Sequence, residues 1–112
     1  MWAEPIKFRS AQAPSRQPVC VAVRGEAREG CEDEFEAMLR DLAFAVDADE
    51  PDCSSYVITR QMGSRRHFVV HARFVDWRAF QRHAETPHFN RMLPRLTALL
   101  AAPVSMEIFL EI

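Results

Sequence analysis

Two periods of hydrophobic residues alternate along the chain, and the first change between them lies near residue 30. Valine recurs at alternate positions in residues 19–25, the period-two pattern of a strand with one apolar face. From residue 31 the apolar positions recur at helical spacing and predict a helix with a buried stripe. That stripe consists of Phe35, Met38, Leu39, Leu42 and Val46. We expect the helix to end near residues 47–49, because Pro51 disfavours helical backbone at the residue before it.

The middle of the chain predicts a β-hairpin. Residues 55–61 are rich in β-forming side chains, residues 63–66 suit a turn, and residues 67–74 suit a second strand. Successive side chains of a strand point to opposite faces, so this second strand has an apolar face and a more polar one. The apolar face carries Phe68, Val70, Ala72 and Phe74, and the other carries His67, Val69, His71 and Arg73.

Signals for the start of a helix occur twice after the hairpin. Asp76 is placed to cap a helix, and Thr86 followed by Pro87 is a second helix start. An apolar stripe follows the second start, and we expect Pro94 to kink this helix, because proline removes a backbone hydrogen bond. Residues 104–112 alternate between apolar and polar side chains and predict a last strand.

The predicted order β-α-β-β-α-β is that of the ferredoxin-like α+β fold, a four-stranded antiparallel sheet with the helices on one face. We expect residues 19–112 to form this single domain, preceded by a flexible N-terminal arm over residues 1–18, which contain three prolines. The uncovered face of the sheet would carry Val69 and Phe109. Because an apolar sheet face open to water usually marks an interface, the sequence predicts a homodimer through that face.

Composition narrows the range of partners and compartments. The 112 residues carry a formal charge of −2, which disfavours a dedicated nucleic-acid binder. No apolar run approaches the length of about 20 residues that spans a bilayer, so we expect no membrane partner. The three cysteines, Cys20, Cys31 and Cys53, form no C-x-x-C pair. They are typical of free thiols in a reducing compartment, and we predict a cytoplasmic protein.

Histidines are the candidate acid–base groups. His83 and His88 flank the break between the two predicted helical segments, where either could act as a base or brace the break by hydrogen bonding. The positive end of the helix that begins at Pro87 disfavours a charged His88. His67 and His71 would lie about 13 Å apart on one strand, too far to share a metal ion. We therefore predict no metal site.

Aromatic residues could form the wall of a small-molecule pocket, although each could equally be an ordinary core residue. We expect Tyr56, Phe74, Trp77 and Phe89 to contact an aromatic substrate. Arg60 shares a strand face with Tyr56 and could meet a phenolate or carboxylate, or form a salt bridge at the sheet edge. The chain has three glycines and no glycine-rich phosphate loop, so no motif supports a nucleotide or flavin.

Several segments resemble the antibiotic biosynthesis monooxygenase family, and their order matches it across residues 19–112. The segments are D-E-P-D-C-S-S-Y (49–56), F-V-V-H-A-R-F-V-D-W (68–77), A-F-Q-R-H-A-E-T-P-H-F (79–89) and A-P-V-S-M-E-I-F (102–109). The resemblance implies a dimeric ferredoxin-like α/β barrel. In several members it also implies an oxygenase acting on electron-rich aromatics, quinols or anthrones without metal, flavin or haem.

This chain departs from the family pattern in two respects. Many members carry a Glu on the third strand where this chain has Ala72, so one candidate acid or base is missing. The haem-degrading branch uses an Asn, a Trp and a His at places occupied here by Val23, His83 and Leu93, which disfavours haem degradation.

Two functions therefore remain open. The first is a cofactor-independent monooxygenase that oxidises a quinol-like or polycyclic aromatic substrate with O₂, with His83 or His88 as the base. The second is a non-enzymatic dimer that binds a small apolar ligand, or a stress-related protein on the same fold. The retained H-A-E-T-P-H-F segment favours the first function, and Ala72 favours the second.

Overall fold

The computed structural model describes residues 16–112 and shows a ferredoxin-like α+β fold, as predicted. Residues 1–15, most of the predicted arm, lie outside the described residues. The order of elements is β1 (Val19–Glu26), α1 (Glu32–Asp49), β2 (Cys53–Arg60), β3 (His67–Phe74), α2 (Trp77–His83), α3 (Pro87–Ala98) and β4 (Ser105–Leu110). None of the helices described here combines the length and the apolar character needed to cross a membrane.

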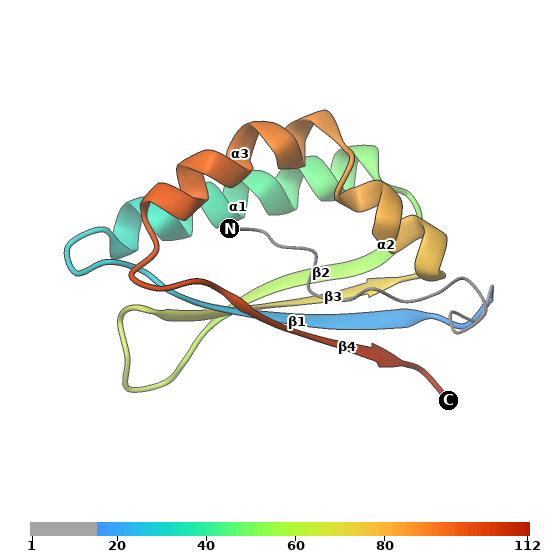
Figure 1. The fold of residues 1–112 in the computed structure, drawn as a ribbon, viewed down its shortest axis with the longest axis horizontal. Helices are drawn as coiled ribbons and strands as arrows, with labels where there is room; N and C mark the ends of the chain where they lie inside the picture. The colour runs from blue at the N-terminus through green and yellow to red at the C-terminus, as the bar shows by residue number, and fades with distance from the viewer. Residues whose placement is uncertain (1–15) are drawn as a thin grey trace.

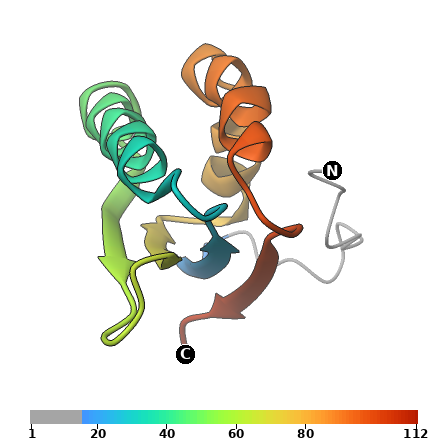
Figure 2. The same cartoon turned by 90° about the vertical axis from the view of Figure 1, so that its left-hand side faces the viewer.

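The four strands form one antiparallel sheet in the order β2-β3-β1-β4. Figures 1 and 2 show α1 and α3 side by side above the same face of this sheet, with α2 below the start of α3. The β2–β3 hairpin turns at Gly63, whose φ of +83° is one that glycine adopts without strain. The opposite face of the sheet carries no helix of the described chain (Figure 2). We call it the open face.

Burial follows the predicted periodicity closely. The five buried residues of α1 are the five of the predicted stripe, and the apolar face of β3 is buried under the helices. Helix α1 ends at Asp49, two residues before Pro51, as expected. Asp76 and Thr86 are the N-caps of α2 and α3. These signals were correct because each depends on local backbone chemistry.

The strand ends differ slightly from the predicted ones. Strand β2 begins two residues earlier than predicted, at Cys53, because its first residue pairs with Phe74. Strand β4 is shorter than the predicted 104–112 and spans Ser105–Leu110. Helix α3 continues through Pro94 as one helix from Pro87 to Ala98. The predicted boundaries therefore differ by one or two residues, which is the usual uncertainty of element ends.

Candidate active site

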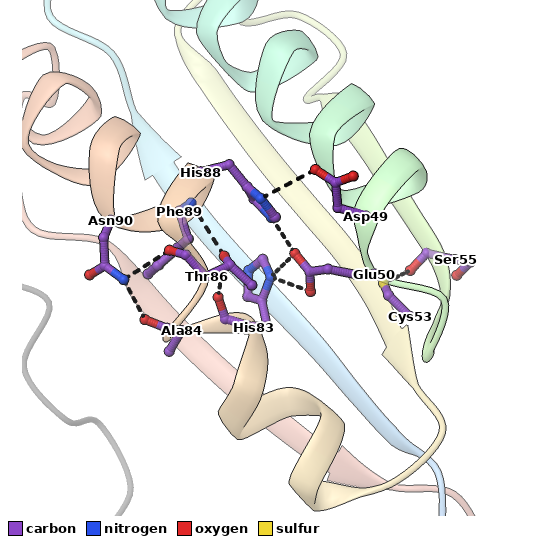
Figure 3. Close-up of polar contacts among 10 residues, drawn as sticks. All are labelled: Asp49, Glu50, Cys53, Ser55, His83, Ala84, Thr86, His88, Phe89 and Asn90. Atoms are coloured by element: carbon purple, nitrogen blue, oxygen red, sulfur yellow. Dashed lines mark hydrogen bonds and ion pairs between the residues drawn. The ribbon is translucent and has the colours of Figure 1, made fainter.

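The connection between α2 and α3 places two histidines beside each other. Oγ1 of Thr86 accepts a hydrogen bond from the backbone N–H of Phe89 (3.3 Å) and donates one to the carbonyl of His83 (2.9 Å). This single side chain therefore ties the last residue of α2 to the first turn of α3 (Figure 3). These two hydrogen bonds fix the backbone that carries His83 and His88.

A third side chain, Glu50, reaches both histidines from the end of α1. Figure 3 shows its carboxylate between the two imidazole rings. The Nδ1 atom of His83 lies 3.0 Å from each carboxylate oxygen, and Nε2 of His88 lies 2.5 Å from Oε2. The side chains are all buried, with 8% of each histidine and 9% of Glu50 exposed. Asp49 lies farther away, with Oδ2 4.0 Å from Nδ1 of His88.

The charge of Glu50 determines which nitrogen of His83 can accept a proton. Burial raises the pKa of the Glu50 carboxyl, but hydrogen bonds and positive charge from His83 and His88 outweigh it, and the pKa lies below its ordinary value of 4.5. Glu50 is thus an ionised carboxylate near neutral pH, which can only accept hydrogen bonds. The proton on His83 therefore sits on Nδ1. Nε2 makes no hydrogen bond within residues 16–112, and in the neutral ring it carries the free lone pair.

His83 also belongs to the wall of a cavity of about 90 Å³ between the sheet and the helices. Apart from His83, Tyr56 and Thr97, the side chains of this wall are apolar. Three aromatic rings surround the imidazole, with centroid distances of 4.8 Å to Phe89, 5.4 Å to Phe74 and 5.8 Å to Tyr56. The arrangement is a carboxylate-bound imidazole at the surface of an apolar cavity, which is the geometry of a general base.

Tyr56 is another polar residue of the same wall. Burial raises the pKa of its hydroxyl, and the nearby Cys53 and Glu50 add to the effect. The hydroxyl is therefore protonated at neutral pH and can donate a hydrogen bond. Burial also raises the pKa of the Cys53 thiol, to about 11, with a further contribution from the charge of Glu50. Cys53 is consequently a neutral thiol rather than a nucleophilic thiolate.

The structure brings together four of the seven predicted site residues at the cavity wall: Tyr56, Phe74, His83 and Phe89. The other three lie off the wall. His88 sits behind it, bound to Glu50. Trp77 packs on the ring of Phe80, at 5.3 Å between centroids.

Arg60 lies at the edge of the sheet, where the second of its two predicted roles applies. Its Nη1 atom lies 3.0 Å from Glu36 on α1, and its guanidinium lies 5.8 Å from the centroid of the Phe68 ring. The salt bridge keeps the guanidinium away from the cavity, because Glu36 faces the edge strand rather than the sheet interior.

Glu50 is the site residue that sequence reasoning missed. It stands directly after α1, among acidic residues typical of a solvated surface. One signal was available, because a carboxylate at the negative end of a helix is unfavourable unless something compensates it. The compensation comes from His83 and His88, which are 33 and 38 residues away in the sequence.

The family departures noted above also have a structural position. Ala72 is 8% exposed and lies in the cavity wall, so the missing carboxylate would have faced the cavity. Val23 and Leu93 line the same cavity with apolar groups. Within residues 16–112, no group of three or more His, Cys, Asp or Glu side chains is arranged to hold a metal ion. In the Glu50 cluster the carboxylate and imidazoles bond directly to one another.

Comparison with known proteins agrees with this architecture. The family model described as antibiotic biosynthesis monooxygenase matches residues 18–95. A search of curated proteins finds no match. A candidate antibiotic biosynthesis monooxygenase from Caulobacter crescentus CB15 has a TM-score of 0.83 and 23% identity, and the match covers 87% of this chain and 92% of that one.

Two further solved structures share the fold. PA3566 from Pseudomonas aeruginosa has a TM-score of 0.78 and 24% identity, with 88% of this chain and 98% of that one covered. A variant of SnoaB from Streptomyces nogalater, described as a cofactor-independent oxygenase, has a TM-score of 0.73 and 25% identity over 83% of this chain and 91% of that one. Since the family model covers well over half of the chain, this protein belongs to the antibiotic biosynthesis monooxygenase family.

Proposed function

We propose that this protein is a cofactor-independent monooxygenase that oxidises a quinol-like or polycyclic aromatic substrate with O₂. The observation that carries the proposal is the position of His83, with Nδ1 on the Glu50 carboxylate and the ring at the wall of an apolar cavity. Membership of the family supports an oxygenase. The description of SnoaB as a cofactor-independent oxygenase supports a reaction without an added redox group.

The first step of the proposed reaction is a proton transfer to His83. O₂ accepts an electron readily only from an electron-rich substrate, and a substrate becomes more electron-rich when it loses a proton. In the proposed step, Nε2 of His83 therefore takes a proton from a phenolic hydroxyl or an acidic ring carbon. The resulting anion then reduces O₂. Overall, the substrate loses two hydrogen atoms and gains one oxygen atom, and the second oxygen atom leaves as water.

The cavity wall suits such a substrate. The rings of Phe74 and Phe89 pack around His83 and offer apolar surface to an aromatic ring and to O₂. The protonated hydroxyl of Tyr56 can donate a hydrogen bond to a substrate oxygen as negative charge develops on it. Trp77, Arg60 and His88 lie off the wall and have no direct contact with substrate in this proposal.

Oxygen consumption tests the proposal. The purified, metal-stripped protein is mixed with a panel of quinols and anthrones, and O₂ uptake is compared with the spontaneous rate. Uptake by the wild type is expected to be lost in His83→Ala and kept in Asp52→Asn, because the Asp52 carboxylate binds the exposed Arg82 and contacts neither His83 nor His88. Wild-type uptake by His83→Ala would remove the assigned base.

A non-enzymatic role in binding a small apolar ligand is the second candidate, and Ala72 is the observation that favours it. The wall has a methyl group where many family members carry a carboxylate. This role predicts that quinones and aromatic hydrocarbons bind the cavity and quench the fluorescence of its aromatic residues, while O₂ uptake stays at the spontaneous rate across the panel.

We also propose that the protein forms a homodimer through the open face. Val57 and Phe109 lie on this face with 50% and 53% of their surface exposed, and burying them against a second copy would remove apolar surface from water. Light scattering after gel filtration is expected to show a dimer for the wild type and for Phe44→Lys. Phe44 is 78% exposed on α1, away from the sheet. The change Phe109→Lys is expected to give a monomer.

A cytoplasmic location fits the state of the thiols. Cys20, Cys31 and Cys53 are all free and half-buried, which is typical of proteins kept in a reducing compartment. We therefore propose the cytoplasm as the compartment, and fractionation of cells that express a tagged chain tests it.

A further inference from the structure

The proposed reaction uses one imidazole, yet two buried imidazoles share the Glu50 carboxylate. The shorter of the two contacts belongs to His88, at 2.5 Å, whereas His83 lies 3.0 Å from each carboxylate oxygen. His88 does not line the cavity, so it cannot meet a substrate there. Its place suggests that it acts on His83 through the carboxylate that both rings contact (Figure 3).

We propose that Glu50 and His88 are positioning residues with opposite effects on His83. Glu50 fixes the Nδ1–H form of the His83 ring and increases the proton affinity of Nε2. His88 decreases that affinity by drawing on the same carboxylate. The importance of this balance for catalysis rests on the proposed function, but the balance itself is a property of the resting protein.

The effect of Glu50 follows from charge and geometry. A carboxylate hydrogen-bonded to one nitrogen of an imidazole selects the tautomer with the proton on that nitrogen, and it stabilises the positive charge that forms when the other nitrogen is protonated. Burial strengthens this interaction, because only 8–9% of each side chain in the pair is exposed to water. Nε2 of His83 is thereby oriented as the proton acceptor.

The effect of His88 follows from competition for one negative charge. A single carboxylate can balance one imidazolium but not two in a buried cluster. The hydrogen bond from Nε2 of His88 occupies Oε2 and reduces the negative charge that this oxygen offers to His83. Any positive charge on His88 adds repulsion. The hydrogen bond from His88 and the charge repulsion act in the same direction, and both make His83 lose its proton more easily.

The other ionisable groups around the pair come from α1 and β2. Asp49 lies on the side of His88, 4.0 Å from Nδ1, and is mostly exposed. Cys53 and Tyr56 lie on β2, and the raised pKa of each keeps it neutral. The rings of Phe74 and Phe89, from β3 and α3, add no charge. Glu50 is therefore the principal negative charge that acts on His83.

The test is nitrogen-15 NMR of the histidine rings, which reports both tautomer and titration without any substrate. In the wild type, His83 is expected in the Nδ1–H form. Glu50→Gln is expected to mix the tautomers and to lower the titration midpoint of His83 relative to the wild type, because the hydrogen bond to a charged group is lost. His88→Leu is expected to move the midpoint in the opposite direction.

The control is Asp52→Asn, which removes a nearby carboxylate that binds the exposed Arg82 at 2.7 Å and touches neither histidine. It is expected to leave the tautomer and the midpoint unchanged. If His88→Leu does not fold, as judged from amide NMR spectra, His88→Gln keeps a donor for Glu50 and is expected to raise the midpoint by less. Shifts of the same sign in the Glu50 and His88 variants, or no shift, would overturn the proposal.

The same variants separate this inference from the proposed function. If O₂ uptake occurs, its pH profile is expected to move down in Glu50→Gln and up in His88→Leu, with little change in KM. If the NMR shifts are found but no substrate of the panel is oxidised, the balance stands and the oxygenase proposal fails. If O₂ uptake depends on His83 but the NMR shifts are absent, the oxygenase proposal stands and the balance fails.

Discussion

The four histidines of this chain form two pairs with contrasting surroundings. The side chains of His83 and His88 are each 8% exposed and share the carboxylate of Glu50. His67 and His71 belong to β3 and face the other way. They bond to hydroxyl groups at exposed positions, His67 to Ser64 at 2.6 Å and His71 to Thr59 at 3.1 Å. The same residue type therefore occurs once in a buried charged cluster and once beside hydroxyl groups at the surface of the chain.

The contrast shows what makes a histidine suitable as a base. Water can replace a lost partner of His67, whose side chain is 47% exposed at the hairpin end of β3, so neither its orientation nor its charge is tightly controlled. The buried pair has no such replacement, and the Glu50 carboxylate decides which nitrogen of His83 carries the proton. Candidate bases are thus better recognised by their buried partner than by their position in the sequence. The following changes test this contrast, beginning with the largest expected effect.

The largest difference in stability is expected between variants of Glu50, which contacts both buried histidines, and Glu26, which contacts His67. Glu50→Ala leaves two buried imidazoles without their acceptor and is expected to lower the free energy of unfolding by about 2–4 kcal/mol. Glu26 lies 3.8 Å from His67 and 3.1 Å from Arg66 at a partly exposed site. Glu26→Ala is expected to cost less than about 1 kcal/mol. Urea unfolding monitored by circular dichroism measures both, and equal losses would contradict the contrast.

The pH dependence of stability is the next effect in size. The pKa of Glu50 lies below 4.5 in the folded protein. The folded protein therefore stabilises the ionised carboxylate of Glu50 relative to the unfolded chain. The stabilisation is present above the unfolded pKa and is lost as the pH falls through the folded value. The slope it adds is at most about 1.4 kcal/mol per pH unit for one proton.

Unfolding measured between pH 3 and pH 6 checks this sign. The wild type is expected to lose more stability toward low pH than Glu50→Gln, which cannot titrate at this position. Glu36 also has a lowered pKa, through its hydrogen bond to Arg40, and this contribution is the same in both proteins. Parallel curves for the wild type and Glu50→Gln would show that the buried cluster does not titrate with folding.

Thr86 should have a smaller effect. Thr86→Ala removes the cap of α3 and the hydrogen bond to the carbonyl of His83, and is expected to cost about 1 kcal/mol. Because this side chain ties α2 to α3, its loss is also expected to broaden the NMR signals of both buried histidines. Thr86→Ser keeps the hydroxyl and serves as the matched control. Unchanged histidine signals in Thr86→Ala would mean that packing alone holds the two rings.

The smallest effect is expected at the exposed pair. His67→Ala removes a ring that is 47% exposed and contacts Ser64 and Glu26. Surface changes of this kind usually alter stability by no more than about 0.5 kcal/mol. Thermal unfolding of His67→Ala beside the wild type measures it. A loss as large as that of Glu50→Ala would erase the distinction between the two pairs.

Much of the fold was determined by the sequence alone. The apolar stripe of α1, the alternation of β3 and the caps at Asp76 and Thr86 are local signals, and each gave the observed element. They are reliable because helices and strands have fixed periods, and because caps act within three residues along the chain. His83 was also identified, from its position at the break between the two helical segments.

The tertiary structure alone decided how the site is assembled. The contacts of Glu50 join residues 33 and 38 positions apart, and no local period relates them. They meet because α2 folds back over the sheet toward the end of α1, and the α2–α3 turn then brings His88 beside the same carboxylate (Figure 3). Burial after this convergence turns a surface-like acidic residue into the partner of two imidazoles, and places Arg60 at the sheet edge instead of in the cavity.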